Sequence, residues 1–222
     1  MKRTVLITGG ARGIGAAIAE RFQEQGHEVL KPLRAEIDLA RPESLEAYIS
    51  RESSRPIDVL INNAGINILN RIETMDAAAW QAMLQVNLTS PVRLTQAFLP
   101  GMKERRWGRV LNVSSIFSLV TREKRAAYSM TKAALNAFAR SLTIEYGPCG
   151  ILANTLCPGY VDSALTRQNN TPLEMEAISG TIPLRRMAQA EEIARVAYFL
   201  CSDENTYITG QEIVADGGFL CQ

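Results

Sequence analysis

A chain of 222 residues with 46% hydrophobic and 21% charged residues is long enough for one large domain with a sizeable core and has a globular composition. The net charge of +1 provides no bulk field for nucleic acid or an anionic membrane, and the four cysteines and single histidine, His27, argue against a metal site or a Ser-His-Asp triad. With no signal peptide and no apolar run of about 18 residues, we expect a cytoplasmic protein with reduced thiols.

The chain opens with a buried strand over residues 4–7, a glycine-rich loop over residues 8–15 and an amphipathic helix to about residue 25. Glycines let a backbone approach a pyrophosphate, and the helix start offers free N–H groups and a positive dipole end. The alternative is that Gly9, Gly13 and Gly15 only permit a tight turn. The strand–loop–helix context favours a dinucleotide site.

The second strand, residues 26–30, runs into Lys31 and Arg34 without the acid that binds the ribose 2′-hydroxyl of NAD. Arg12 also lies close by. These cations favour NADP(H), with Arg34 as a predicted cofactor contact. Glu36 and the ordinary surface role of such charges keep NAD(H) open.

Residues 37–39 follow too soon for a helical crossover of a dozen or more residues. Either the second crossover is shortened to a loop, or residues 37–39 are only a strand stub. A helix at about 42–51 comes next.

The strand at residues 57–61 ends in Asn62, Asn63, Ala64 and Gly65, which suit close contact with a ligand at a strand's carboxyl end. A purely structural role is equally open for Asn62. A helix at 77–87 carries Asn87, and a second helix follows at 91–102. An Asn within an apolar helix is unfavourable unless it is bonded, so it is either a structural clamp or part of a proton path.

The strand at residues 108–113 leads to Ser115, and a helix over residues 126–145 carries Tyr128 and Lys132. Residues four apart share a helix face. The lysine charge is expected to lower the tyrosine pKa below about 10, toward the range of a useful proton donor. Ser115 is placed to hydrogen-bond the oxygen that Tyr128 protonates.

A further strand at 151–157 ends in Pro158 and Gly159. The polar segment at about 160–185 indicates a mobile lid, although a disordered surface loop would look the same. A helix at 191–200 and a strand at 212–215 complete the chain.

Alternating strands and helices predict a single doubly wound, Rossmann-type α/β domain over residues 1–222, with a mainly parallel sheet, helices on both faces and a shortened second crossover. We expect a cofactor half at about 1–110 and a catalytic and substrate half at about 111–222. The ligand should lie outside the carboxyl ends of the strands.

These motifs, with Tyr128-x-x-x-Lys132 at their centre, have the order and spacing of the short-chain dehydrogenase/reductase family. The chain resembles its classical branch and is similar to 3-oxoacyl-acyl-carrier-protein reductases. The resemblance implies that Tyr128 is the general acid or base, that Lys132 lowers its pKa and holds the nicotinamide ribose, that Ser115 polarises the carbonyl, and that Asn87 anchors a water.

The resemblance also implies contacts with the cofactor phosphates, ribose, adenine and nicotinamide at Gly9, Arg12, Gly13, Ile14, Gly15, Asp38, Leu39, Asn63, Ala64, Gly65, Tyr128, Lys132, Pro158, Gly159, Val161 and Ser163. The family usually has Thr where Ser163 stands, and the hydroxyl remains. The shortened crossover is the larger departure, because cofactor specificity is read there.

We therefore hypothesise an NADP(H)-dependent oxidoreductase, without a metal, that moves a hydride between nicotinamide and a small carbonyl or secondary alcohol, a 3-oxoacyl-type ketone being favoured. The alternatives are an NAD-dependent sugar or polyol dehydrogenase, a non-catalytic dinucleotide-binding regulatory relative, and an epimerase or dehydratase, for which the region after Pro158 leaves little room. We expect no nucleic-acid or membrane partner. The family suggests a homotetramer or homodimer, and Leu135 and Phe138 face either a second subunit or the core.

Overall fold

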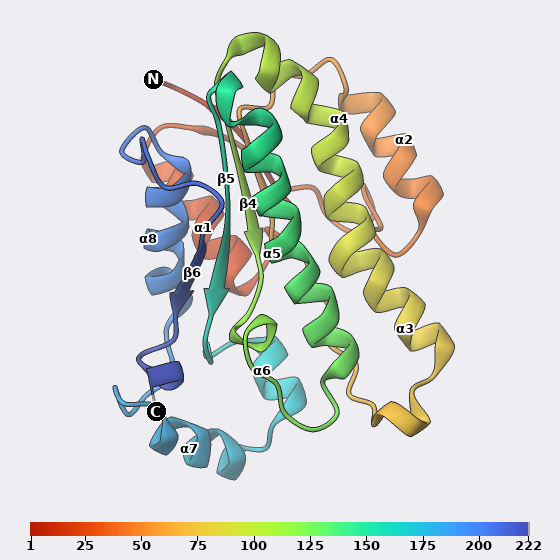
Figure 1. Ribbon diagram of the computed structural model, residues 1–222, viewed down its shortest axis with the longest axis vertical. Coiled ribbons are helices and arrows are strands. Elements are labelled where there is room, and N and C mark those ends of the chain that lie inside the picture. Colours follow the sequence, from red (N-terminus) through yellow and green to blue (C-terminus); the bar gives the residue numbers. More distant parts are fainter. Residues whose placement is uncertain (222) are drawn as a thin grey trace.

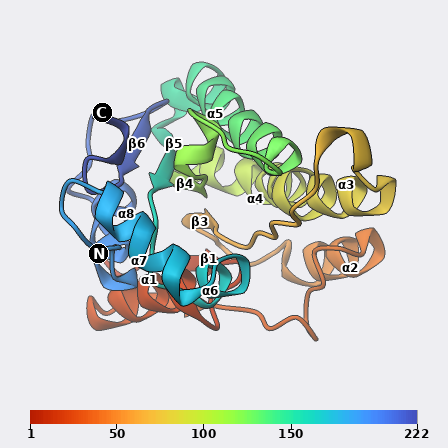
Figure 2. The same ribbon diagram turned by 90° about the horizontal axis from the view of Figure 1, so that it is seen from below.

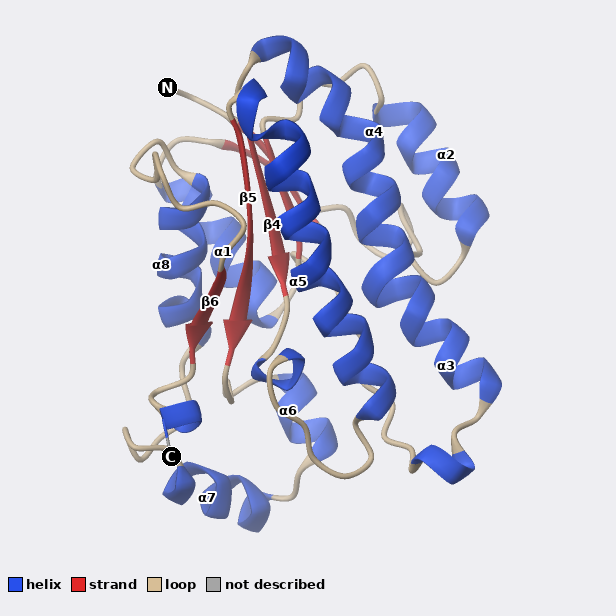
Figure 3. Cartoon of the chain, in the orientation of Figure 1, coloured by secondary structure: helices blue, strands red, loops and turns tan. Residues whose placement is uncertain are grey.

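The computed structural model describes residues 1–221, so Gln222, the last residue of the predicted domain, lies outside the described residues. Within this range the strands form one six-stranded sheet in the order β2-β1-β3-β4-β5-β6, and every neighbouring pair is parallel (Figure 3). The strands are β1 (Thr4–Ile7), β2 (Glu28–Leu30), β3 (Val59–Asn62), β4 (Gly108–Val113), β5 (Ile151–Pro158) and β6 (Glu212–Ala215).

Helices cover both faces of the sheet, as Figures 1 and 2 show: α1 and α8 lie on one face, and α4 and α5 on the other, with α2 beside α4. The α-helices are α1 (Gly13–Glu24), α2 (Pro42–Glu52), α3 (Ala77–Leu84), α4 (Ser90–Arg105), α5 (Ala126–Tyr146), α6 (Ala164–Asn169), α7 (Pro172–Thr181) and α8 (Ala190–Cys201). The predicted doubly wound α/β fold is confirmed. No helix within residues 1–221 has both the length and the apolarity needed to cross a bilayer.

The side-chain alternation of β1 explains how the sheet holds two cores. Val5 and Ile7 pack with α1 and α8, whereas Leu6 packs with α2 and α4 on the opposite face, and all three are fully buried. Strands buried on both faces have continuous apolar sequences, which is the pattern that predicted them. Leu135 of α5 is buried within the chain, whereas Phe138 is only partly buried against the core that contains Leu6, so a contact of Phe138 with a second subunit stays a prediction.

The predicted shortened crossover to a strand at residues 37–39 is not formed, because β2 connects to β3 through a loop and then the helix α2. Residues 37–39 form no strand, and β2 stands at the sheet edge with β1 as its neighbour. Ile37 and Leu39 nevertheless bury their side chains against the core that contains Leu6. The hydroxyl of Ser90 donates to the Leu39 carbonyl at 2.9 Å, which pins this loop to the start of α4.

The predicted helices at 77–87 and 91–102 follow one another directly through a π-helical turn, η2 (Gln85–Thr89), between α3 and α4. Asp76 caps α3, because its side chain accepts a hydrogen bond from the Ala79 N–H at 2.8 Å. A π-turn places one extra residue in a helical turn and often marks a functional site. Here the turn contains Asn87.

The segment predicted as a lid is folded into α6 and α7, which lie across the carboxyl-terminal end of the sheet (Figures 1 and 2). Thr171 and Glu174 form a reciprocal capping box at the start of α7. The polar residues of this segment therefore begin helices, and the mobility of the lid stays a prediction.

Candidate active site

The glycine loop after β1 is packed so tightly that Gly15 has no room for a side chain. A Cβ added to Gly15 would lie 2.3 Å from the Gly9 carbonyl oxygen and 2.4 Å from Asn63 Nδ2. Gly9 and Gly13 have φ of 66° and 55°, the left-handed region that favours glycine. The loop is a cradle of bare backbone, and the pyrophosphate of a dinucleotide fits such a surface.

Asn63 fixes the cradle from the neighbouring strand. Its Nδ2 donates to the carbonyl oxygens of Thr8 at 3.0 Å and Gly9 at 3.2 Å. The Thr8 hydroxyl accepts from the backbone N–H groups of Asn63 and Ala64, both at 3.1 Å. β1 and β3 are neighbours whose connections leave in opposite directions, so this crevice is the switch point where such sheets bind ligands.

Asn62 has a structural role. Its Nδ2 donates to Asn112 Oδ1 at 2.9 Å on the adjacent strand, and it is buried. The equally open ligand-binding role has no support from this geometry, because the side chain is directed along the sheet toward β4.

The three cations predicted to lie near the cofactor ribose differ in their surroundings. Arg34 is 82% exposed and forms an ion pair with Asp38 at 3.2 Å. Arg12 is exposed at the start of α1. Lys31 lies against the glycine loop, because a Cβ on Gly10 would come within 2.7 Å of the Lys31 Cβ. Leu39, predicted at the adenine, has its side chain in the core.

The three central residues are brought together at the carboxyl end of β4. Tyr128 and Lys132 lie on one face of α5, and Ser115 precedes the short helix η3 (Ile116–Ser118). The Ser115 side chain acts on the Tyr128 phenol and lowers its pKa, and all three residues are buried. The Phe117 N–H donates to the Ser115 hydroxyl oxygen at 3.1 Å, which orients that side chain.

The pKa of Tyr128 departs from its usual value in the opposite direction to our expectation. Burial raises the pKa of the phenol, and the hydrogen bond from Ser115 and the charge of Arg125 only partly oppose this. Lys132 Nζ lies 5.7 Å from the Tyr128 ring centroid and donates to the Val113 carbonyl at 2.7 Å. Burial also lowers the pKa of Lys132 to about 8. The predicted direction was therefore wrong, because desolvation outweighs the lowering effects of Ser115 and Arg125.

Asn87 is a clamp. Its Oδ1 accepts from the Ile66 N–H at 2.8 Å, and its Nδ2 donates to the Ile66 carbonyl at 2.9 Å and to Thr131 Oγ1 at 3.2 Å. Gly65 lies beside it, since a Cβ there would be 3.3 Å from Lys132 Nζ and 3.4 Å from Asn87 Oδ1. The loop after β3 is thus held against α5. A proton path through Asn87 stays a prediction.

The residues predicted at the nicotinamide follow β5. The Gly159 N–H donates to the Ala215 carbonyl at 2.9 Å, and a Cβ on Gly159 would lie 2.7 Å from the Asp216 Cα. Val161 is buried, and Ser163 caps α6 by accepting from the Thr166 N–H at 3.3 Å. Pro158 ends β5, so these residues lie at the same edge of the sheet as Ser115.

Two further polar residues, not predicted from the sequence, hold Ser115 in place. The Ser118 hydroxyl donates to the Ser115 carbonyl at 2.6 Å, and Asn136 Nδ2 donates to the Ser118 oxygen at 3.0 Å. Asn136 lies one turn after Lys132, so polar residues recur every fourth position on the buried face of α5. That recurrence was the available signal.

Comparison with known proteins agrees with this geometry. A family model described as "Enoyl-(Acyl carrier protein) reductase" matches residues 30–220. The acetoacetyl-CoA reductase of Shinella zoogloeoides is 36% identical, with 98% of each chain covered. The 3-oxoacyl-[acyl-carrier-protein] reductase FabG of Pseudomonas aeruginosa is 34% identical over 97% of this chain and 96% of that protein.

A solved structure provides a third likeness. The gluconate 5-dehydrogenase of Burkholderia cenocepacia, in complex with NADP and tartrate, has a TM-score of 0.89 and 27% identity over 100% of this chain and 97% of that chain. The chain therefore belongs to the short-chain dehydrogenase/reductase family, and it is an oxidoreductase of that family. The resemblance inferred from the motifs is confirmed.

Proposed function

We propose that this chain is an NADP(H)-dependent oxidoreductase that interconverts a ketone and a secondary alcohol. The observation that carries the proposal is the burial of Ser115, Tyr128 and Lys132 together at the end of β4, next to the glycine cradle. When bound, the nicotinamide supplies the hydride to the carbonyl carbon or accepts it from the alcohol.

The chain's own residues supply the proton and the positioning. The raised pKa of Tyr128 keeps the phenol protonated at neutral pH, which suits an acid that donates to a developing alkoxide. Ser115 accepts from Phe117 N and keeps its own proton for an oxygen partner. Lys132, with a pKa of about 8, is mainly charged at pH 7 and steadies the negative charge that forms on the phenol.

The cofactor preference rests on the cations around the cradle. Lys31 begins against Gly10, and Arg12 stands at the start of α1. Their charges suit a 2′-phosphate, whereas the charge of Arg34 is offset by Asp38. The gluconate 5-dehydrogenase neighbour also binds NADP. NADPH should therefore give a higher kcat/KM than NADH, and a ratio below one would refute this part.

Two substrate classes have specific support. The sequence relatives are reductases of 3-oxoacyl thioesters and acetoacetyl-CoA, whereas the structural neighbour is a dehydrogenase of gluconate, a sugar acid. The first favours a 3-oxoacyl ketone, and the second favours a hydroxy acid. A homotetramer or homodimer is proposed from the family resemblance, and light scattering tests it.

The decisive experiment is Tyr128→Phe. The variant should bind NADPH as the wild type does and lose at least about a hundredfold in kcat, because one positioned proton donor contributes about 10²–10⁴-fold. NADPH fluorescence measures binding, and absorbance of the reduced nicotinamide measures turnover. Retained turnover would remove Tyr128 as the acid. Cofactor binding by the wild type without turnover of any carbonyl would favour a non-catalytic regulatory protein.

A further inference from the structure

Arg125 is a buried cation beside the catalytic tyrosine. It directly precedes α5, three residues before Tyr128, and only 6% of its surface is exposed. Its guanidinium carbon lies 4.7 Å from the centroid of the Phe117 ring, two residues beyond Ser115. Its charge acts on Tyr128 and lowers the pKa of that phenol. Arg125 therefore lies close to Tyr128 and to the short helix that follows Ser115.

The Arg125 side chain has neither a hydrogen bond nor an ion pair with any part of residues 1–221. The ionisable groups that act on its pKa are Tyr160, Arg122 and Tyr128, and none is a carboxylate. Some side-chain nitrogen and oxygen atoms of residues 1–221 have neither contact with solvent nor a hydrogen-bond partner, and the nitrogens of Arg125 are not among them. The Arg125 nitrogens are therefore accessible to solvent. Arg125 is thus buried as a whole, while the N–H donors of its guanidinium group stay accessible to solvent.

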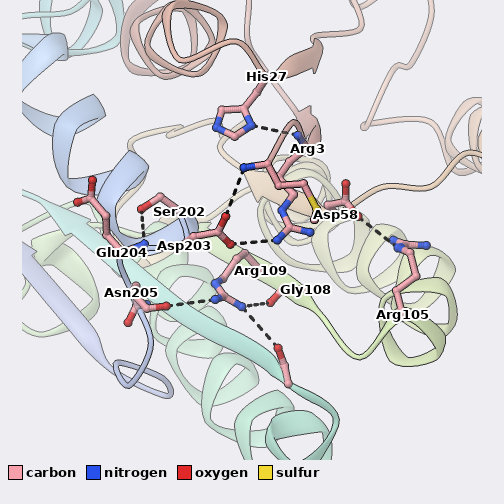
Figure 4. Close-up of polar contacts among 12 residues, drawn as sticks. Arg3, His27, Asp58, Arg105, Gly108, Arg109, Ser202, Asp203, Glu204 and Asn205 are labelled. Carbon is pink, nitrogen blue, oxygen red and sulfur yellow. Dashed lines mark hydrogen bonds and ion pairs between the residues drawn. The ribbon is translucent and has the colours of Figure 1, made fainter.

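A second buried arginine shows how this fold treats such a group when its role is structural. Arg109 is also 6% exposed and also stacks on an aromatic ring, that of Trp107. In contrast to Arg125, it donates to the backbone carbonyls of Gly108 at 2.9 Å and Asn205 at 3.1 Å (Figure 4). The two terminal nitrogens of this structural arginine are paired with protein oxygens, and only its Nε is sealed without a partner among residues 1–221.

Leaving a buried cation without an anionic partner is costly to a fold. The lowered pKa of Arg125, caused by desolvation, has the same origin. Such a cost beside reacting groups is typical of a site that awaits its ligand. Arg125 is not an ordinary surface arginine, because an arginine in a surface loop is solvated or paired with an anion.

We propose that Arg125 binds a carboxylate of the substrate and so restricts the enzyme to keto acids and hydroxy acids. This inference rests on the proposed oxidoreductase function and decides between its two substrate classes. The contact with the Phe117 ring holds the guanidinium group, whose parallel N–H donors match a planar carboxylate. One cation balances one carboxylate charge. Arg122, the other cation that acts on the pKa of Arg125, is exposed and donates to the Tyr160 hydroxyl at 3.2 Å, and a phosphate substrate tests whether its charge takes part.

The test compares a charged ketone with its neutral ester. Wild type, Arg125→Gln and Arg71→Gln are assayed with NADPH and acetoacetate, ethyl acetoacetate or dihydroxyacetone phosphate. Arg71 is the matched control. It is an exposed arginine that pairs with Glu123 at 3.7 Å, and the preceding residue, Asn70, donates its N–H to the Lys124 carbonyl. In Arg125→Gln the ratio of kcat/KM for the acid to that for the ester should fall about 10- to 100-fold, the range for hydrogen bonds to a charged group. The Arg71→Gln ratio should equal that of the wild type.

A binding measurement separates this inference from the proposed function. Tartrate should raise the Tm of the NADPH-loaded wild type and of Arg71→Gln but not of Arg125→Gln. Without ligand, Arg125→Gln should melt no lower than the wild type, whereas Arg109→Gln should melt lower. An unchanged acid-to-ester ratio, an unchanged tartrate shift, or a preference for the phosphate over the acid would overturn the carboxylate site. Turnover of the ester alone would uphold the proposed function and reject the site; a tartrate shift without any turnover would do the reverse.

Discussion

Gly15→Ala should damage the cofactor cradle more than its size suggests. The new methyl carbon would sit 2.3 Å from the Gly9 carbonyl oxygen and 2.4 Å from Asn63 Nδ2. Gly9 O belongs to a backbone held in the left-handed region, and Asn63 is held by its own hydrogen bonds. Neither neighbour can yield without breaking the contact that shapes the loop.

The expected cost has three parts. Overpacking at a buried position costs about 1–3 kcal/mol. Displacing Asn63 loses its bonds to Thr8 and Gly9, about 1 kcal/mol each. Replacing glycine near the start of α1 returns up to about 1 kcal/mol of helix propensity. The net loss is about 2–4 kcal/mol, which for a chain of this size lowers Tm by roughly 5–15 °C.

Thermal unfolding and NADPH titration measure the two consequences, and the affinity for NADPH should fall at least about tenfold. Gly180→Ala is the matched control, since Gly180 lies in α7 with nothing within 4 Å of an added Cβ and no positive φ. That change should stabilise the protein by about 0.5–1 kcal/mol. Equal Tm values for wild type and Gly15→Ala, with unchanged NADPH affinity, would refute the close approach of Gly15 to the loop.

Two further predictions concern the clamp and the buried lysine. Asn87→Ala leaves the N–H and carbonyl of Ile66 without their partners, so the free energy of unfolding should fall by about 2–4 kcal/mol and kcat should decrease. Denaturant unfolding and steady-state kinetics measure the two effects, and unchanged stability would exclude a clamp. Lys132→Met should be more stable than the wild type at pH 7, because the lysine pKa falls from 10.5 to about 8 on folding, a penalty of about 3 kcal/mol. The penalty is full below pH 8 and vanishes as pH rises to about 10.5, where the native lysine is neutral, so the difference in Tm should shrink over that window; a difference independent of pH would count against a perturbed lysine.

The strand ends and the Tyr128–Lys132 pair could be predicted because they depend on local sequence. Continuous apolar runs identify strands buried on two faces, and parallel strands bring their carboxyl ends to one edge. A spacing of four places two residues on one helix face wherever that helix packs. None of this requires knowledge of what covers the helix.

The direction of the Tyr128 pKa shift could not be predicted in this way. The spacing brings a cation near the phenol, but burial, which raises the pKa, depends on Phe117, Met83 and their neighbours packing around it. The positioning roles of Ser118 and Asn136 could not be predicted for the same reason, since their contact joins η3 to α5. Arg125 is the extreme case: in sequence it is one more charge in a polar loop, and only the fold buries it.

The loop between β2 and α2 shows how the fold can separate stability from cofactor choice. Ile37 and Leu39 cover the sheet face at Leu6 without forming a strand, and Ser90 holds the loop at the Leu39 carbonyl. The charges between β2 and α2, by contrast, are solvent-facing, with Arg34 82% exposed. Exposed charges contribute little to stability. Substitutions there can therefore change the preference between NADPH and NADH while the two anchoring apolar side chains keep the loop, and with it the cradle's edge, in place.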